Sequence, residues 1–337
     1  MRSVASSRFR SCERSSCATA RTTGPRRSST RRFSAAVNPA ESSTSKIASA
    51  RVELFCACWP PGPLERENRN AISDRIESAS MAAILLDVDG VLHVSGEPIA
   101  GAAAAVRRLR ADGHRLRFVT NSTTKSRVQL AAQLRSIGIE VSNDEVQTTG
   151  DVATRQLAGK RVLALTMPGI LDDLDGIQLV GMNVDAVLVG GADEGEETGR
   201  IFSYLNLNRA FHELQAGADL YSLHKNRWWQ TADGPRLDGG AFVAALEYAA
   251  DTEAEILGKP SPAYFHAALE ALDAHPELTW MIGDDLEGDI VGANSNGINT
   301  ILVRTGKFRP DEVERSRLQP DGIVSSIAQV PEWLDAH

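Results

Sequence analysis

From Met81 onward, short apolar runs alternate with segments in which apolar residues recur every three or four positions. The apolar runs, at 83–86, 115–119, 161–165, 184–189, 220–223, 280–282 and 300–303, have the length and composition of buried strands. Helical patterns follow the first two runs, over 102–110 and 127–137. This alternation predicts an α/β fold with a mainly parallel sheet covered by helices on both faces.

The first eighty residues lack this patterning and are rich in Arg and Ser. We predict that residues 1–80 are disordered and contribute nothing to chemistry. Two explanations of the segment stay open. It resembles an organellar transit peptide, yet Met81 directly precedes the first segment with a folded pattern and is a plausible start of translation. We favour translation from Met81.

Charge is unevenly divided along the chain. Residues 1–80 carry fourteen Lys/Arg against seven Asp/Glu, a balance of +7, so the overall −8 leaves −15 for residues 81–337. The negative charge of residues 81–337 argues against nucleic-acid binding. No apolar stretch of the chain approaches the length of a membrane span. Small anionic substrates stay open, because a metal ion and a few cations can create a local positive site.

All four cysteines lie in the first eighty residues, at Cys12, Cys17, Cys56 and Cys58. Cys56 and Cys58 have no accompanying His or second cysteine pair at ligand spacing, so we do not interpret them as a zinc site. The body from Met81 onward has no cysteine, as expected in a reducing compartment, and we predict a cytoplasmic protein.

Polar clusters follow the predicted strands, where parallel sheets collect their functional residues. The first is Asp87-Val88-Asp89-Gly90, directly after the run at 83–86. Asp and Gly also favour turns, but two acids at a buried strand end repel each other unless a cation lies beside them. A divalent metal would remove that conflict.

The next two clusters offer groups that suit an anion. Thr120-Asn121-Ser122 presents hydroxyl, amide and backbone N–H groups after the run at 115–119, although such a triplet is also typical of a helix N-cap. In the cluster 258–262, Ser261 and Pro262 are expected to be the N-cap and first residue of a helix at 263–272. Lys259 is not needed for that capping.

The fourth cluster is Gly283-Asp284-Asp285, with Asp289 a turn later, after the run at 280–282. Carboxylates at this spacing are the hard oxygen ligands that Mg²⁺ prefers. Each cluster alone is compatible with turn or capping chemistry. Their order and their repeated position after strands indicate one shared site.

The order Asp-x-Asp-Gly, Thr-Asn-Ser, Gly-Lys-Pro and Gly-Asp-Asp resembles the four motifs of the haloacid dehalogenase superfamily, subfamily IIA. The segments 203–211, 246–249 and 303–308 add to the likeness, which covers residues 81–337. It implies a Rossmann-like doubly wound parallel sheet with an inserted α/β cap, divided as core 81–154, cap 155–250 and core 251–337. It also implies a Mg²⁺-dependent phosphatase acting on a small phosphorylated molecule, with a cap that can support a homodimer.

The resemblance implies a role for each acid of the first and fourth motifs. Asp87 would attack phosphorus and form an aspartyl-phosphate, and Asp89 would be the general acid and base. Mg²⁺ would be held by Asp87, the backbone carbonyl of Asp89 and Asp284. Gly90 would let the chain turn without a Cβ crowding the phosphate.

The other motif residues would serve the phosphoryl group. Thr120 and Asn121 would grip its oxygens, and Lys259 would neutralise charge on them and on the nucleophile. Asp285 and Asp289 are interpreted as groups that support the metal ligands or as acids at a helix N-terminus.

Within the insert, the stretch 224–229 combines cationic and aromatic residues that could bind the organic part of a substrate. Packing of Trp228 and Trp229 in the cap's own core is an equal alternative. The glycine-rich acidic segment 190–199 matches no nucleotide-binding motif, and we predict a plain surface loop. Lys307 is expected to be an exposed lysine.

Three alternatives to a phosphatase remain. Hydrolysis of a carbon–halogen bond needs neither Asp89 nor Asp284, so the presence of both acids disfavours this reaction. A phosphotransferase or mutase of the same superfamily would pass the phosphoryl group to an acceptor other than water. A non-catalytic binding protein is disfavoured by the complete set of motif residues, since function is carried by the site and not by the fold.

Overall fold

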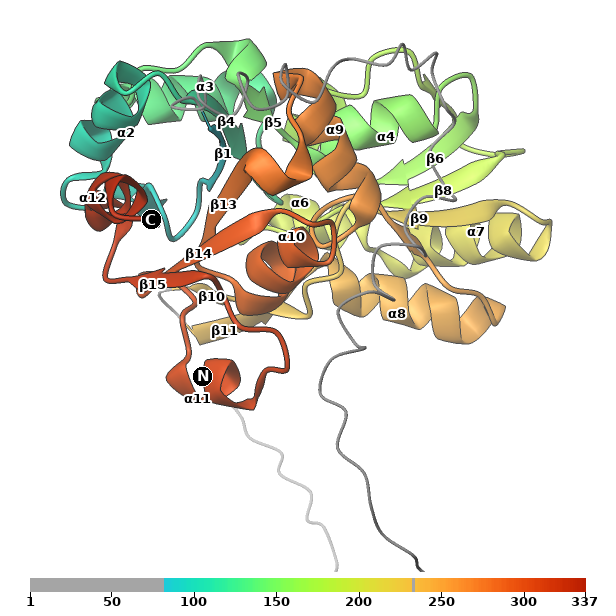
Figure 1. Ribbon diagram of the computed structural model, residues 1–337. Coiled ribbons are helices and arrows are strands. Elements are labelled where there is room, and N and C mark those ends of the chain that lie inside the picture. The colour runs from blue at the N-terminus through green and yellow to red at the C-terminus, as the bar shows by residue number, and fades with distance from the viewer. Residues whose placement is uncertain (1–81, 232–233) are drawn as a thin grey trace, which may run out of the picture. The chain divides into compact units, whose positions relative to one another are not determined.

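The computed structural model describes residues 82–231 and 234–337, so the predictions made for residues 1–80 lie outside the described residues. Its main sheet has six strands in the order β15-β14-β13-β1-β4-β5, and all neighbouring strands are parallel (Figure 1). These strands are β1 (Ala83–Asp87), β4 (Arg115–Val119), β5 (Val146–Gln147), β13 (Thr279–Gly283), β14 (Asn299–Val303) and β15 (Gly322–Val324).

A second, smaller sheet is formed by the residues between β5 and the third sequence cluster. Its five strands, in the order β12-β9-β8-β6-β7, are also parallel. They are β6 (Arg161–Leu165), β7 (Gln178–Leu179), β8 (Ala186–Val189), β9 (Asp219–Ser222) and β12 (Glu255–Ile256). Two hairpins complete the strands: β2 (His93–Val94) with β3 (Glu97–Pro98), and β10 (Trp228–Thr231) with β11 (Gly234–Leu237).

Helices connect most of the parallel strands. They are α2 (Ala102–Ala111), α3 (Arg127–Ser136), α4 (Thr149–Gln156), α5 (Pro168–Leu171), α6 (Glu196–Ile201), α7 (Tyr204–Gln215), α8 (Gly239–Ala250), α9 (Pro262–Leu272), α10 (Gly292–Asn294), α11 (Pro310–Arg315) and α12 (Val330–Asp335). A π-helical turn, Leu286–Val291, leads into α10. No helix in the described ranges is both long and apolar enough to cross a membrane.

Alternation of side chains along β1 supplies both faces of the main sheet with core residues. Ile84 and Leu86 pack in one cluster with apolar residues of α2, α3 and α12. Leu85 points to the opposite face and packs with Tyr264 and Phe265 of α9. Because both faces of β1 are covered, its sequence is a continuous apolar run and not an alternating one.

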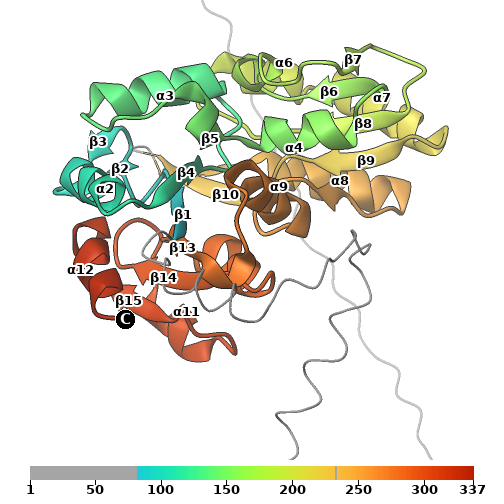
Figure 2. The same cartoon turned by 45° about the horizontal axis from the view of Figure 1, so that its top comes forward.

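The second sheet is likewise covered on both faces. Leu163 of β6 and Val187 of β8 pack with residues of α7 and α8. Figure 2 shows these two helices lying along the second sheet. Leu188 of β8, on the opposite face, belongs to the same buried cluster as Leu85 of the main sheet. The two sheets therefore share one apolar core through α4 and α9, which fixes the second sheet against the first.

The chain order of the strands places a switch point beside β1. From β1 the chain moves to β4 and β5 on one side, and it returns to β13, β14 and β15 on the other side. In open parallel sheets of this kind, ligands bind beyond the carboxyl ends of the strands at the switch point. The α/β class, the parallel sheet and the inserted second α/β unit are confirmed.

One prediction about the insert is wrong. The segment 190–199 is not a plain surface loop, because Gly190 and Gly191 are buried and Glu196 begins helix α6. A Cβ at Gly190 would lie 1.9 Å from the hydroxyl oxygen of Thr166, so only glycine fits this close approach. These glycines pack at the carboxyl end of the second sheet.

Candidate active site

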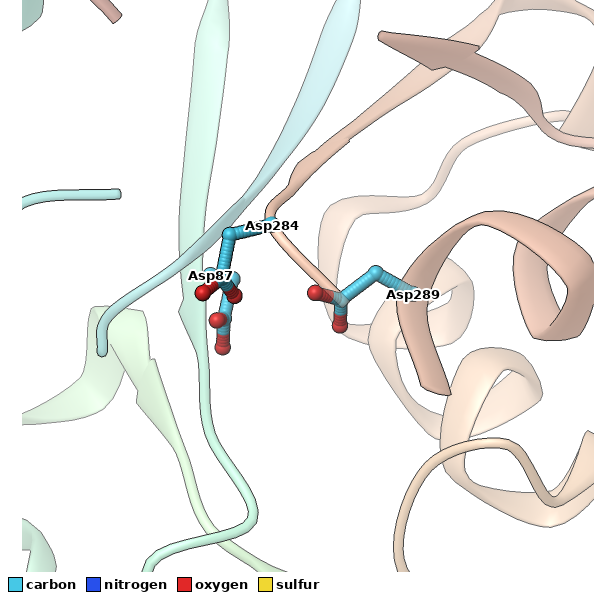
Figure 3. Close-up of side chains that lie close together, drawn as sticks. All are labelled: Asp87, Asp284 and Asp289. Atoms are coloured by element: carbon cyan, nitrogen blue, oxygen red, sulfur yellow. The ribbon is translucent and has the colours of Figure 1, made fainter. Parts of the chain in front are cut away.

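Three buried aspartates meet at the switch point. Asp87 is the last residue of β1, Asp284 follows β13, and Asp289 lies on the π-helical turn (Figure 3). Each offers a carboxylate oxygen, and these oxygens lie within 4.8 Å of one another. Because β1 and β13 are neighbours in the sheet, residues almost two hundred positions apart are brought to one place.

Lys259 is the cation inside this cluster. Its Nζ donates to Asp87 Oδ1 at 2.5 Å and to Asp289 Oδ1 at 2.7 Å, and the side chain is buried. Burial alone would lower the pKa of Lys259, but Asp289 and Asp87 outweigh it and raise that pKa well above its ordinary value. The lysine is therefore held in its charged form.

The acids outnumber the lysine. Burial raises the pKa of Asp87 well above its usual range, and the neighbouring Asp289 adds to this, although Lys259 opposes it. Burial, followed by Asp289, raises the pKa of Asp284 to about 6. Three carboxylates and one lysine leave a formal charge of −2 in a buried site, which is the charge that a divalent cation would balance.

Asp284 supplies the second indication that a cation fits. Its side chain is only 2% exposed, and its Oδ2 accepts a hydrogen bond from the backbone N–H of Lys307 at 2.6 Å. Oδ1 is buried and has no hydrogen-bond partner among the described residues. A buried carboxylate oxygen without a donor is costly unless a ligand satisfies it, so the residues present fit Mg²⁺ or a similar ion.

Asp89 lies apart from this cluster. Its side chain is 59% exposed, and its Oδ2 accepts a hydrogen bond from the Thr120 hydroxyl at 3.4 Å. Oδ1 is 3.8 Å from Nε2 of the buried His93. From the sequence, the carboxylates of Asp87 and Asp89 are expected to point the same way. In the structure the carboxylate of Asp87 lies instead beside those of Asp284 and Asp289, which come much later in the sequence, and the side chain of Asp89 faces solvent.

Thr120 and Asn121 follow β4, next to β1. The backbone N–H of Thr120 donates to the buried Tyr264 hydroxyl at 2.8 Å, and that hydroxyl lies 2.9 Å from the Thr120 carbonyl oxygen. Sequence reasoning missed Tyr264, because its phenol on α9 has the same apolar pattern as any core aromatic. It fixes the end of β4.

The side chain of Asn121 contacts the backbone of the loop that carries Lys259. Its Nδ2 donates to the carbonyl oxygen of Lys259, and its Oδ1 accepts from the N–H of Lys259, each at 2.8 Å. A Cβ at Gly258 would lie 2.6 Å from the same Oδ1. The amide therefore holds the backbone of Lys259 in place, and the grip on a phosphoryl oxygen predicted for Asn121 stays a prediction.

The two further acids of the fourth motif lie at the start of the π-helical turn beside the site. Asp285 is the N-cap of the π-helical turn, and its Oδ1 accepts from the N–H groups of Glu287 and Gly288. Asp289 uses one oxygen for Lys259 and accepts from the N–H of Asp285 at 3.2 Å with the other. Both oxygens of Asp289 therefore accept hydrogen bonds, whereas Asp284 has one oxygen without a donor among the described residues.

Where the second sheet meets the main sheet, a buried polar cluster lies beside the second motif. The Thr123 hydroxyl accepts from the N–H of Gly191 at 2.9 Å and is 3.4 Å from Nε2 of His224. His224 Nδ1 accepts from the N–H of Asn226, which places the ring proton on Nε2, 3.8 Å from Asp238 Oδ1. Burial lowers the pKa of His224, although Asp238 opposes this.

The two tryptophans of the insert do not belong to its apolar core. Trp228 is 54% exposed and pairs across the hairpin with the exposed Leu237. Trp229 is half-buried, and its indole N–H is buried without a partner among the described residues. Neither contributes to the cluster between β6, β8, α7 and α8, so packing in the cap core does not explain them.

Comparison with known proteins agrees with this geometry. A haloacid dehalogenase-like hydrolase model matches residues 84–179, and a HAD-hydrolase-like model matches residues 256–330. The phospholysine phosphohistidine inorganic pyrophosphate phosphatase of Xenopus laevis is 41% identical over 262 residues, which are 75% of this chain and 94% of that protein. The chain therefore belongs to the haloacid dehalogenase-like hydrolases.

Solved structures place it among the phosphatases of that family. The p-nitrophenyl phosphatase from Archaeoglobus fulgidus superposes with a TM-score of 0.69 at 25% identity, covering 75% of this chain and 98% of that one. A glycerol phosphate phosphatase from Mycobacterium tuberculosis in complex with magnesium gives a TM-score of 0.66 at 26% identity, covering 73% and 75%. The protein is a phosphatase of the haloacid dehalogenase superfamily, similar to enzymes that act on small phosphorylated molecules.

Proposed function

We propose that the protein is a Mg²⁺-dependent phosphatase that works through an aspartyl-phosphate on Asp87. The observation that supports this most is the buried cluster of Asp87, Lys259 and Asp284, in which one lysine does not balance the acids and one Asp284 oxygen lacks a donor. Such an arrangement is poor as a structural ion pair and well suited to a cation with a phosphoryl group.

In the first chemical step, a carboxylate oxygen of Asp87 attacks phosphorus, and the bond from phosphorus to the leaving group breaks. Asp89 gives its proton to the leaving atom. In the second step Asp89 takes a proton from a water molecule, which attacks phosphorus and releases Asp87 and inorganic phosphate. The exposed position of Asp89, with the Thr120 hydroxyl on its Oδ2, supports a group that exchanges protons with substrate and water.

The side chains of Asp87 and Asp284 and the backbone carbonyl of Asp89 would hold the metal. When bound, Mg²⁺ offsets the negative charge that the phosphoryl group brings to the carboxylates. Lys259 stays charged and stabilises both Asp87 and the phosphoryl oxygens. We assign the grip on those oxygens to Thr120, while Asn121 acts by holding the backbone that carries Lys259.

We propose that the insert, 155–250 in the sequence division, acts as a cap over this site. Support comes from the buried contact of Thr123 with Gly191 and His224, which joins the insert to the second motif. Strand β12 at Glu255–Ile256 pairs within the second sheet, a few residues past that division. The exposed Trp228 is available to a substrate's organic part.

The substrate class we propose is a small phosphomonoester, phosphoramidate or pyrophosphate. The likeness to a phospholysine phosphohistidine inorganic pyrophosphate phosphatase supports phosphoramidates and pyrophosphate, and the fold neighbours named for p-nitrophenyl phosphate support aryl esters. The homodimer and the cytoplasmic location stay predictions of the sequence.

The test is release of inorganic phosphate by the full chain from p-nitrophenyl phosphate, pyrophosphate and a phosphohistidine peptide, with Mg²⁺ or with EDTA. We expect release that depends on Mg²⁺, and a loss of about 10⁴-fold or more in kcat for Asp87→Asn, because an amide cannot act as the nucleophile. Near-normal turnover by Asp87→Asn would contradict the mechanism. Release unaffected by EDTA would contradict the metal requirement.

A further inference from the structure

The segment Thr305-Gly306-Lys307, just beyond β14, crosses the ends of both strands that carry the site. The Thr305 hydroxyl donates to the carbonyl oxygen of Gly90 at 2.5 Å. Two residues later, the backbone N–H of Lys307 donates to Asp284 Oδ2 at 2.6 Å. The segment, which we call the 305–307 strap, therefore ties the turn after β1 to the carboxylate after β13.

The approach is close enough to exclude any side chain between the strap and Asp284. A Cβ at Gly306 would lie 1.9 Å from Asp284 Oδ2 and 2.7 Å from the Cα of Gly90. A Cβ at Gly90 would lie 2.0 Å from the same Oδ2. Both glycines also have positive φ, +60° and +85°, so the Asp284 carboxylate is enclosed by two bare Cα atoms in conformations that favour glycine.

This enclosure decides which oxygen Asp284 can offer. Oδ2 is engaged by the Lys307 N–H, whereas Oδ1 is buried and has no partner among the described residues. A carboxylate that could rotate would exchange its two oxygens, and a cation would have to order it at an entropic cost. Hydrogen bonds from outside the ligand set remove that freedom and are known to tune metal sites.

The side chain of Lys307 adds a second tether and is separable from the backbone contact. Its Nζ lies 2.8 Å from Asp285 Oδ2, although the side chain is 61% exposed. Asp285 caps the turn that carries Asp289, so the strap also contacts the third part of the site. An exposed pair of this kind contributes little on its own, and the strap's effect should reside mainly in its backbone and in Thr305.

We infer that the 305–307 strap is a positioning element of the cation site, which fixes the Asp284 carboxylate with Oδ1 toward the ion and thereby sets the affinity for Mg²⁺. The inference rests on the proposed function, because it assumes that Asp284 is a metal ligand. Thr305 and Gly306 are positioning residues under this inference, and they need not touch the substrate.

The experiment uses four variants of the full chain. Gly306→Ala introduces the clash with Asp284, and Gly159→Ala is its matched control, since Gly159 has a similar φ of +75° but open space around its Cβ. Thr305→Val removes the hydrogen bond to Gly90, and Thr305→Ser restores the hydroxyl. Mg²⁺ binding is measured by calorimetry and by the Mg²⁺-induced rise in unfolding temperature, with circular dichroism as a check of folding.

We expect Gly306→Ala and Thr305→Val to weaken Mg²⁺ binding about 10- to 100-fold, the usual effect of losing a group that orients a metal ligand. Thr305→Ser and Gly159→Ala should bind like the wild type. A merely structural role would lower the metal-free unfolding temperature of Gly306→Ala, by more than that of Gly159→Ala because of the clash, and leave the Mg²⁺ affinity of the folded protein unchanged.

Two results would overturn the inference, and they are distinguishable. Wild-type binding in both folded Thr305→Val and folded Gly306→Ala would contradict the positioning role alone; if Gly306→Ala does not fold, unchanged binding in Thr305→Val is sufficient. A wild-type chain that binds no Mg²⁺ would contradict the proposed metal requirement, and the inference would fail with it.

Discussion

Replacing Lys259 by Met tests how the buried charges are balanced. Methionine keeps an unbranched, flexible side chain of similar length but removes the ammonium that contacts Asp87 at 2.5 Å and Asp289 at 2.7 Å. The formal charge of the three acids and the lysine changes from −2 to −3. Removing one partner of a buried ion pair typically costs about 3–5 kcal/mol, and we expect about 3 kcal/mol at pH 8 without Mg²⁺, because the acids can take up protons.

The pKa values of the buried acids decide how the stability deficit of Lys259→Met changes with pH. Burial already raises the pKa of Asp87 and raises that of Asp284 to about 6, and loss of Lys259 would raise the pKa of Asp87 further. A carboxyl group whose pKa is higher in the folded state binds protons more tightly when the protein is folded. It therefore destabilises the folded state at high pH, where it is ionised, and destabilises it less as the pH falls. The deficit of Lys259→Met should therefore shrink as the pH falls through 6.

Urea unfolding in EDTA at pH 8 and at pH 5.5, followed by tryptophan fluorescence, measures this deficit. Lys125→Met is the matched control, because Lys125 is exposed and bonds only to the Gln133 side chain among the described residues. The control should change stability by less than about 0.5 kcal/mol at either pH. An equally small effect of Lys259→Met at pH 8, or a deficit that grows toward pH 5.5, would refute the charge balance described above.

Three other variants separate the roles of neighbouring groups. Asp89→Asn should lower kcat by about 10²–10⁴-fold, because the side chain of Asp89 transfers the protons. The calorimetric affinity for Mg²⁺ should stay within about threefold, because the metal would be held by the backbone carbonyl, which the substitution keeps. A loss of metal binding instead of turnover would contradict this. Trp228→Ala should alter kcat/KM for substrates with an organic leaving group more than for pyrophosphate, and equal effects on both would argue for a packing role. His224→Gln should make the free energy of unfolding less dependent on pH. Burial lowers the pKa of His224, so the wild type loses stability as the pH falls below about 6.5, and the variant should not. If the change in unfolding midpoint between pH 7.5 and pH 5.5 is the same in the variant as in the wild type, the expectation is contradicted.

The sequence was sufficient to predict the strands that carry the site. The apolar runs at 115–119 and 161–165 coincide with β4 and β6, and the helix predicted after Ser261 begins at Pro262 as expected. These elements have strong local signals, because a run buried on both faces is continuously apolar and a serine followed by proline is a typical helix start. The short strands β5, β7, β12 and β15 contain only two or three residues and give no such signal.

Contacts made across the fold were not predictable in the same way. The pairing of Asn121 with the backbone of Lys259 joins residues 138 positions apart, and a triplet such as Thr-Asn-Ser looks the same whether its amide faces a ligand or a neighbouring loop. The burial of Gly190 and Gly191 likewise depends on Thr166 and Thr123, which come from other segments. Motif order located the site, whereas the orientation of each group depended on packing.

The neighbours of β1 have a consequence for how the protein becomes active. Asp87 is synthesised early, but its partner Lys259 comes 172 residues later, and β13 pairs with β1 only after the whole insert has been made. Closing a loop of that length costs conformational entropy before the contacts between its ends can stabilise the fold. Assembly of this centre is therefore expected late in folding. Turnover would then report completion of the fold, and a chain ending before β13 would be inert even with its nucleophile and insert intact.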